Sequence, residues 1–162
     1  MKPEIRIGTG FDFHPFATGR KLVLGGVEIP WEKGLAGHSD ADVLIHAIID
    51  AILGALAKGD IGMIFPDNDH EFKDIDSRIL LRKVYDIMIK CKYQINNLDA
   101  TICAQRPKLR PYIDDMRSNL AADLQTSIDN ISVKATTEEG LGISGSEAGM
   151  TAQAIVMLVS ED

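Results

Sequence analysis

Two segments of the sequence place metal-binding side chains at spacings that could bring them together. Asp12 and His14 lie two residues apart in an apolar-alternating segment, so in a strand both side chains would point to the same side. His46 lies near the start of the helix expected next along the chain. One carboxylate and two imidazoles would leave zinc an open position for a substrate oxygen, which is typical of a catalytic site. The alternative is that His14 is an ordinary strand histidine and His46 a solvated helix residue.

Two further segments have side chains suited to phosphate. Residues 134–140, Lys-Ala-Thr-Thr-Glu-Glu-Gly, follow an expected strand and offer hydroxyls, backbone N–H groups and carboxylates. Because carboxylates repel phosphates unless a hard cation lies between them, Glu139 is expected to bind Mg²⁺, unless the segment is an ordinary acidic turn. Residues 106–110, Arg-Pro-Lys-Leu-Arg, form a tight basic cluster at the start of an expected helix, where anions are favoured. The alternative there is a solvated helix start.

The elements that must position these residues follow from the hydrophobic periodicity. Asp42, His46 and Asp50 are spaced by four on the first helix and are expected to face solvent or a cleft. The order of elements predicts an α+β two-layer sandwich, with a mixed four-stranded sheet and helices on one face. The expected strands cover residues 6–13, 21–29, 93–105, 131–135 and 149–159, and the first two are expected to be arranged like a hairpin. The expected helices run from Ser39 or Asp40 to Lys58, from Ser77 to Cys91, and over 107–127.

The composition indicates one domain over residues 1–162, with 45% hydrophobic residues. With 24 acidic and 17 basic side chains, the net charge of −7 argues against binding to nucleic acid or to an anionic membrane. We find neither a signal peptide nor an apolar run long enough to span a bilayer. Cys91 and Cys103 form neither a CxxC pair nor a disulfide framework. These observations favour a cytoplasmic protein.

Seven blocks of the sequence, in order, resemble the family of 2-C-methyl-D-erythritol 2,4-cyclodiphosphate synthases. Together they are far more specific than any single glycine-rich loop. The resemblance implies a phosphorus-oxygen lyase of the non-mevalonate isoprenoid pathway. Its substrate would be 4-diphosphocytidyl-2-C-methyl-D-erythritol 2-phosphate, its products the cyclic diphosphate and CMP, and its assembly a homotrimer with active sites between subunits. The blocks are residues 6–14, 24–27, 37–46, 59–62, 65–69, 104–108 and 134–137.

The resemblance also assigns roles to individual residues. It implies one Zn²⁺ per subunit on Asp12, His14 and His46, and a second ion, Mg²⁺ or Mn²⁺, on Glu139 at the substrate diphosphate. His38 and Thr137 match residues that stabilise the transition state. The residues implied to contact the substrate are Asp12, Phe13, His14, His38, Ser39, Asp60, Ile61, Gly62, Phe65, Pro66, Asp67, Asn68, Asp69, Ala104, Gln105, Arg106, Pro107, Lys108, Leu109, Arg110, Thr136, Thr137, Glu138 and Glu139.

The sequence departs from the family pattern at two positions. Many members have an aromatic residue and an arginine where this chain has Ile143 and Ser146. The departure affects contacts to substrate or effector at that point, including contacts near the trimer axis. It leaves unchanged the metal ligands and the cytidine pocket, which the resemblance implies is formed by residues 104–110.

Two other functions fit the same ligand set. Two histidines and one carboxylate with open positions also suit Fe(II) in a mononuclear non-haem oxygenase. Those enzymes usually have all-β barrels and a different order of ligands. The second alternative is a metal-dependent module that binds cytidine nucleotides without turning over a substrate.

Overall fold

The structure is a computed structural model that describes residues 2–161. None of the helices in this range is long and apolar enough to cross a bilayer. The elements are β1 (Ile5–Thr18), β2 (Leu22–Leu24), β3 (Val27–Ile29), β4 (Lys33–Leu35), α1 (Val43–Ala55), α2 (Ile61–Ile64), η1 (His70–Phe72), α3 (Ser77–Lys90), β5 (Tyr93–Cys103), η2 (Arg110–Tyr112), α4 (Ile113–Asp123), η3 (Ile128–Asn130), β6 (Ile131–Thr136), α5 (Gly142–Gly145) and β7 (Gly149–Ser160).

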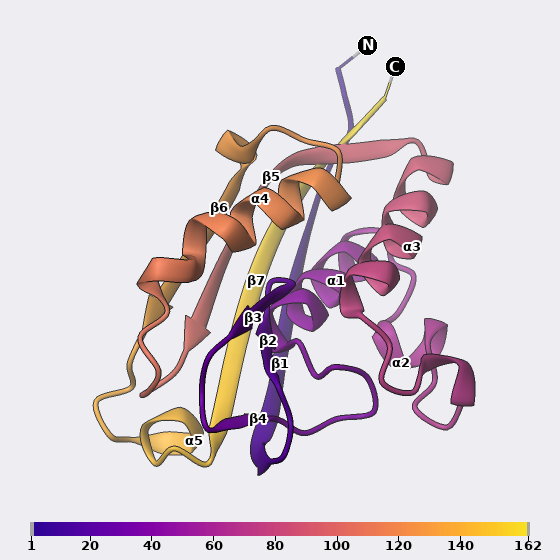
Figure 1. Cartoon of the computed structure of the whole chain (residues 1–162). Coiled ribbons are helices and arrows are strands. Elements are labelled where there is room, and N and C mark those ends of the chain that lie inside the picture. Colours follow the sequence, from indigo (N-terminus) through magenta and orange to yellow (C-terminus); the bar gives the residue numbers. More distant parts are fainter. Residues whose placement is uncertain (1, 162) are drawn as a thin grey trace.

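The main sheet of residues 2–161 has five strands in the order β4-β1-β7-β5-β6 (Figure 1). It is mixed, because β5 and β6 run parallel while the other neighbours are antiparallel. The mixed α+β character is therefore confirmed, but the prediction of four strands was wrong. The additional strand β4 is only three residues long, and it pairs with the far end of β1, where Phe16 lies opposite Leu35.

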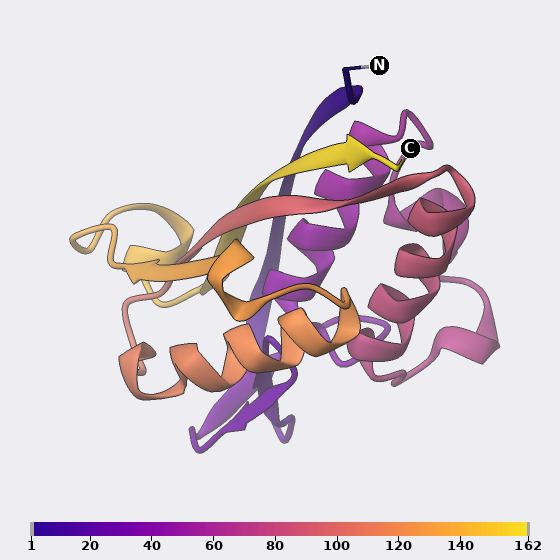
Figure 2. The same ribbon diagram turned by 90° about the horizontal axis from the view of Figure 1, so that it is seen from above.

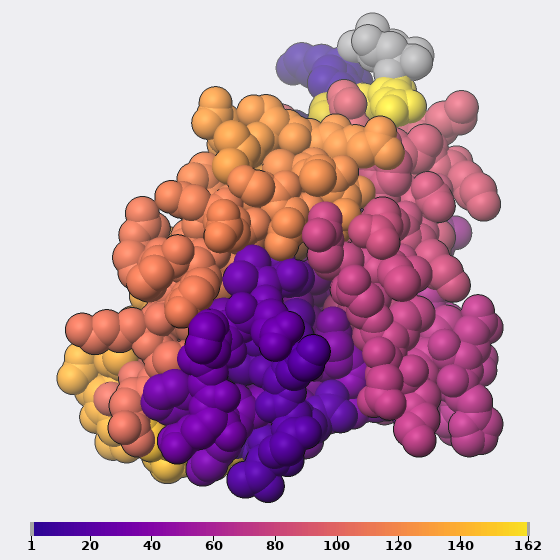
Figure 3. Space-filling model, viewed as in Figure 1, coloured from indigo at the N-terminus to yellow at the C-terminus, as the bar shows by residue number. Residues whose placement is uncertain are grey.

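The expected hairpin between residues 6–13 and 21–29 is absent from the described chain. Instead, β1 pairs with β7 along its length, and β2 and β3 form a small sheet of their own. Gly25 and Gly26, with φ of +56° and +72°, make the two-residue turn between them, which requires positive φ at both positions. Asn119 Nδ2 donates to the carbonyl of Gly25 at 3.0 Å. Figure 3 shows this N-terminal segment, in indigo, filling the surface between α4 and α3.

The helices α1, α3 and α4 lie on one face of the main sheet, as predicted (Figures 1 and 2). The central helix α1 packs against β1 and β7 and is also covered by α3. All of its residues except Asp50 and Gly54 are buried. The expectation of a helix with one buried face was therefore wrong for α1, because other elements cover its second side.

Several helix boundaries differ from those predicted. The side chain of Asp42 accepts from Ile45 N and starts α1 at Val43, and a left-handed residue at Ala57 follows its end. α3 begins at Ser77 as predicted, but Asp76 is its N-cap. Residues 106–109 precede the short turn η2, which begins at Arg110, and α4 begins only at Ile113, so the basic cluster does not open an α-helix.

The close contact between β1 and α1 depends on two glycines. A Cβ atom on Gly8 would lie 1.9 Å from the carbonyl oxygen of Ala51, and one on Gly10 would lie 1.8 Å from that of Ala47. The strand backbone therefore touches the helix backbone directly. Since Asp12 and His14 lie on β1 and His46 lies on α1, this contact sets the distance between them.

We expect Gly10→Ala to separate β1 from α1 and to weaken both folding and metal binding. A methyl group directed at backbone atoms cannot be accommodated by rotation of a side chain, so the cost should reach about 3 kcal/mol, which lowers Tm by roughly 6–12 °C in a chain of this size. Thermal unfolding and a zinc titration measure both effects. Gly54→Ala is the matched control, because its Cβ would meet only Thr9 O at 3.7 Å. Equal Tm values for the two variants would contradict the prediction.

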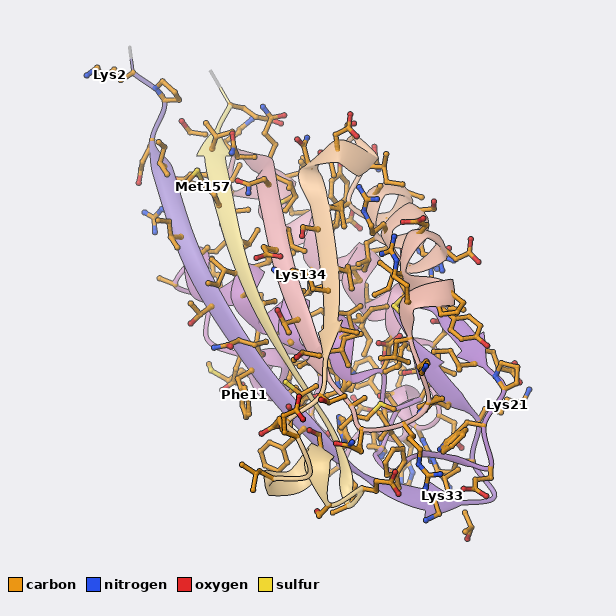
Figure 4. The ribbon with its side chains drawn as sticks, turned by 90° about the vertical axis from the view of Figure 1, so that its left-hand side faces the viewer. Lys2, Phe11, Lys21, Lys33, Lys134 and Met157 are labelled. Carbon is orange, nitrogen blue, oxygen red and sulfur yellow. The ribbon has the colours of Figure 1, made fainter. Side chains whose placement is uncertain are left out.

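The face of the sheet opposite the helices is open and partly apolar (Figure 4). Ile7, Phe11 and Phe13 of β1 are 63%, 57% and 55% exposed, and Ile155 of β7 is 50% exposed. The rings of Phe11 and Phe13 lie 6.1 Å apart. We call Ile7, Phe11, Phe13 and Ile155 the open apolar face. Contiguous exposed apolar surface of this kind marks an interaction site.

Candidate metal centre and nucleotide cavity

Asp12, His14 and His46 converge in the structure, as the sequence predicted. Asp12 Oδ2 lies 2.8 Å from His14 Nε2 and 3.2 Å from His46 Nδ1, and the two nitrogens lie 3.2 Å apart. Ligands of a tetrahedral zinc ion with bonds of about 2.0 Å are separated by about 3.3 Å. The three atoms therefore form one face of a zinc tetrahedron and leave its fourth corner open.

The hydrogen bonds of the two imidazoles direct lone pairs toward this point. His14 Nδ1 donates to the carbonyl oxygen of Ala36 at 3.0 Å, so its Nε2 is the unprotonated nitrogen of the neutral ring. His46 Nε2 lies 3.0 Å from the hydroxyl oxygens of both Ser39 and Ser77. When Nε2 donates to these hydroxyls, Nδ1 of His46 is likewise unprotonated. Histidine ligands of metals are usually held by such outer hydrogen bonds.

The charges at this point favour a cation. Asp12 Oδ2 is buried, and none of its close contacts has the geometry of a hydrogen bond. Burial raises the pKa of Asp12, but the adjacent His14 and His46 outweigh this effect and lower it to about 2. Burial lowers the pKa of His46, but Asp12 outweighs this effect and the net shift is upward. An unpartnered carboxylate oxygen facing two imidazole lone pairs fits a divalent metal ion.

A cavity of about 310 Å³, which we call the metal cavity, opens over the three ligands. It includes five of the other residues implied to contact the substrate: His38, Ser39, Ile61, Phe65 and Asp67. Phe72 and Leu80 also line it and were missed by sequence reasoning, since they lie outside the matching blocks. The ring of Phe72 packs edge-on against Phe65 at 5.3 Å. The lining residues are Asp12, His14, Gly37, His38, Ser39, His46, Ile61, Phe65, Asp67, Phe72 and Leu80.

Other residues expected here have different surroundings. The side chain of Phe13 lies on the open apolar face, because neighbours in a strand point to opposite sides. Asp60 is the N-cap of α2 and accepts from Met63 N at 3.0 Å. The side chain of His38 donates from Nε2 to the carbonyl of Asp69 at 2.9 Å. The structure does not place Gly62, Pro66, Asn68 and Asp69 among the lining residues of the metal cavity.

Asp42 and Asp50, expected on a polar stripe with His46, are bound to backbone instead. Asp42 is fully buried and accepts from the backbone N–H groups of Gly25, Gly26 and Ile45. Burial raises its pKa to about 7 against the opposing effect of these three donors. Asp50 accepts from Ile61 N at 2.8 Å. The three polar residues of α1 therefore have separate functions: helix capping, metal binding and support of α2.

A second cavity of about 240 Å³ lies at the adjacent carboxyl ends of β5 and β6. Because these strands are parallel, with Cys103 opposite Thr136, the segments that follow them meet there. Its lining residues are Ala104, Gln105, Pro107, Lys108, Leu109, Arg110, Ala135, Thr136 and Thr137. We call this space the nucleotide cavity, because it includes most of the segment 104–110, which is expected to form the cytidine pocket. It shares no lining residue with the metal cavity.

Arg106 is the one member of residues 104–110 that does not line the nucleotide cavity. Its guanidinium group makes a bidentate contact with Glu147, with Nη2 to Oε2 at 2.8 Å, and lies over the ring of Trp31. The expectation of Arg106 as a substrate contact therefore has no support in its position. Sequence alone could not reveal this pairing, because Glu147 lies 41 residues away.

The two glutamates of the turn after β6 have different surroundings. Glu138 accepts from Ser144 Oγ at 2.8 Å and is turned toward α5. Glu139 is exposed and has φ of +54°. Neither lines either cavity. Ile143 is 45% exposed on α5, and the hydroxyl of the adjacent Ser146 donates to the carbonyl of Ile143 at 3.2 Å.

Comparison with known proteins assigns the family. The model of the YgbB family matches residues 5–159. The 2-C-methyl-D-erythritol 2,4-cyclodiphosphate synthase of Finegoldia magna is 61% identical over 158 residues, which cover 98% of this chain and 99% of that protein. The chain belongs to the YgbB family of 2-C-methyl-D-erythritol 2,4-cyclodiphosphate synthases. The family predicted from the seven sequence blocks is therefore confirmed.

Solved structures extend the comparison of this YgbB-family chain to three dimensions. The IspF protein of Plasmodium falciparum, in a complex with CDP, is 35% identical with a TM-score of 0.86, and the match covers 98% of this chain and 97% of that one. The bifunctional IspDF of Campylobacter jejuni is 44% identical with a TM-score of 0.95 over 99% of this chain. The chain spans 43% of the length of that bifunctional protein.

Proposed function

We propose that this protein converts 4-diphosphocytidyl-2-C-methyl-D-erythritol 2-phosphate into 2-C-methyl-D-erythritol 2,4-cyclodiphosphate and CMP. The observation on which this depends is the convergence of Asp12, His14 and His46 below an open cavity, in a chain of the YgbB family. The relatives are named as the synthase of this cyclic diphosphate. Because the ring forms as CMP is eliminated from the substrate, such a synthase is a phosphorus-oxygen lyase.

The reaction requires no nucleophile from the protein. An oxygen of the 2-phosphate attacks the β-phosphorus of the same molecule, and the bond from that phosphorus to the bridging oxygen breaks, so that CMP leaves with the oxygen. The protein must hold the 2-phosphate close to the β-phosphorus. Holding reacting groups together in this way can lower the barrier of an intramolecular reaction by on the order of 7–11 kcal/mol. We assign the 2-phosphate end to His38 and Ser39, which line the metal cavity. Thr137, in the nucleotide cavity, is assigned to the transition state together with His38.

Metal ions would offset the repulsion between the phosphates. Zinc on Asp12, His14 and His46 would polarise the β-phosphate as a Lewis acid. A second ion, Mg²⁺ or Mn²⁺, on Glu139 would neutralise charge at the α and β phosphates. The chain itself has a net charge of −7, so local cations and Lys108 must provide the attraction for the substrate.

A homotrimer would complete the site. In one chain the metal cavity and the nucleotide cavity have no residue in common, although one substrate must reach both. The open apolar face provides a surface for assembly. We infer that the metal cavity of one subunit faces the nucleotide cavity of its neighbour, with each substrate bound between two chains. The CDP complex of the Plasmodium falciparum protein supports a cytidine nucleotide as the ligand.

The decisive experiment measures CMP release from the phosphorylated erythritol substrate, with and without a chelator, both in the absence and in the presence of oxygen. We expect release that stops when zinc is removed and returns when zinc is restored. Binding of CDP with no turnover would favour a nucleotide-binding module, and turnover that requires iron and oxygen would favour an oxygenase.

Glu139→Gln is expected to raise the Mg²⁺ concentration needed for half-maximal activity, by about tenfold or more, with unchanged zinc content. The substitution keeps the size of the side chain and removes the charge that a hard cation prefers. A Mg²⁺ titration of CMP release measures the effect. Glu28→Gln is the matched control, because Glu28 is exposed on β3 and lines neither cavity. An unchanged titration for Glu139→Gln would contradict its assignment.

A further inference from the structure

The outer nitrogen of His46 faces two buried hydroxyl groups. Ser39 Oγ and Ser77 Oγ each lie 3.0 Å from His46 Nε2. Ser39 is 6% exposed, and Ser77, the first residue of α3, is fully buried. Because both hydroxyls are buried against Nε2, their hydrogen bonds decide which nitrogen of His46 holds the proton.

The hydrogen of the Ser77 hydroxyl is already committed to Asp40. Ser77 Oγ donates to Asp40 Oδ1, and Ser77 N donates to Asp40 Oδ2 at 3.0 Å. If the hydroxyl instead donated to His46, Ser77 Oγ and Asp40 Oδ1 would be in close contact with no hydrogen between them. Ser77 Oγ must therefore accept from His46, and Nε2 of His46 must be the donor.

We propose that Asp40 and Ser77 are positioning residues for the metal centre, acting as a relay through His46. Asp40 orients the hydroxyl of Ser77, and Ser77 holds the proton of His46 on Nε2, which leaves the lone pair on Nδ1 facing Asp12 and His14. A charged acceptor at the end of such a chain also polarises its hydrogen bonds and makes the imidazole a stronger ligand. The inference rests on the metal centre of the proposed function.

The relay affects one histidine ligand and not the other. His14 is oriented by the backbone carbonyl of Ala36, which no substitution of a side chain removes. The orientation of His46 depends on side chains from two segments. These segments are joined by backbone hydrogen bonds, from Asp40 N to Ile75 O at 3.1 Å and from Asp74 N to His38 O at 2.8 Å. The metal centre is therefore linked to the segment that precedes α3.

Ser77→Ala tests the relay through metal affinity. We expect zinc binding, measured by competition with a chromophoric chelator, to weaken by roughly 10–100-fold, the usual effect of losing an outer partner of a histidine ligand. Ser77→Thr keeps the hydroxyl and should restore most of the affinity. Ser118→Ala, an exposed serine on α4, is the control and should bind zinc as the unmodified protein does.

A double-mutant cycle separates the relay from a merely structural effect. Asp40→Asn should also weaken zinc binding, and combining it with Ser77→Ala should add little, since both break the same chain. Unchanged affinity in Ser77→Ala, or additive losses in the cycle, would overturn the relay and leave Ser39 as the partner that orients His46. Failure of the unmodified protein to bind zinc would instead contradict the proposed metal centre. If Ser77→Ala does not fold, Ser77→Thr and Asp40→Asn alone give the comparison.

Discussion

His46→Ala is expected to yield a folded protein that neither retains zinc nor releases CMP. The substitution removes one of three converging ligands and leaves Asp12 and His14, which cannot hold the ion in a tetrahedral site. Loss of several kcal/mol of charge stabilisation corresponds to a decrease in rate on the order of 10³-fold or more. Zinc content by mass spectrometry and CMP release from the substrate measure the two effects.

The fold is expected to survive this change because the core around α1 is apolar and extensive. Far-UV circular dichroism should match that of the unmodified protein, with a lower Tm because the buried serines lose a partner. His70→Ala is the control, since His70 is exposed on η1 and does not line the metal cavity. A His46→Ala protein that cyclises its substrate at the normal rate would refute the role assigned to His46.

Phe11→Asp is expected to dissociate the assembly and abolish turnover while each chain still binds zinc. Phe11 lies at the centre of the open apolar face, and a carboxylate there would have to be buried without a partner on assembly. We expect subunit association to weaken by at least about 100-fold, since several kcal/mol are lost at each interface. Sedimentation analysis gives the mass, and zinc content and CMP release are measured on the same samples.

The control for this variant is Ile128→Asp. Ile128 is also an exposed apolar residue, but it lies on η3 beside α4, away from the open apolar face. This variant should remain assembled and active. An active, monomeric Phe11→Asp protein would show that one chain contains a complete site and would exclude a site shared between subunits.

Mixing two inactive variants tests the shared site directly. His46→Ala removes a metal ligand, and Thr137→Ala alters the nucleotide cavity. If each site combines the metal cavity of one chain with the nucleotide cavity of the next, roughly a quarter of the sites in randomly mixed trimers would contain two intact halves. Activity should therefore return on mixing. Persistent inactivity of co-assembled chains would contradict the arrangement.

The metal ligands could be predicted from the sequence, because their placement depends on short-range geometry. Asp12 and His14 share one side of β1 through the two-residue period of a strand, and His46 lies in the first turn of α1. The same period places the side chain of Phe13 on the opposite side of β1, so its position on the open apolar face was also predictable from the sequence. The family was likewise recognisable, since its motifs are contiguous blocks.

How these elements meet could not be predicted from the sequence and is visible only in the folded chain. The contact of Gly8 and Gly10 with α1, the strand β4 and the burial of Asp42 all depend on residues distant in the chain. The pairing of Arg106 with Glu147 and the contact of Ser77 with His46 are non-local in the same sense. Periodicity reports which side of an element is apolar, but it contains no information about which distant group will satisfy a particular polar atom. The separation of the metal cavity from the nucleotide cavity is therefore a property of the folded chain alone.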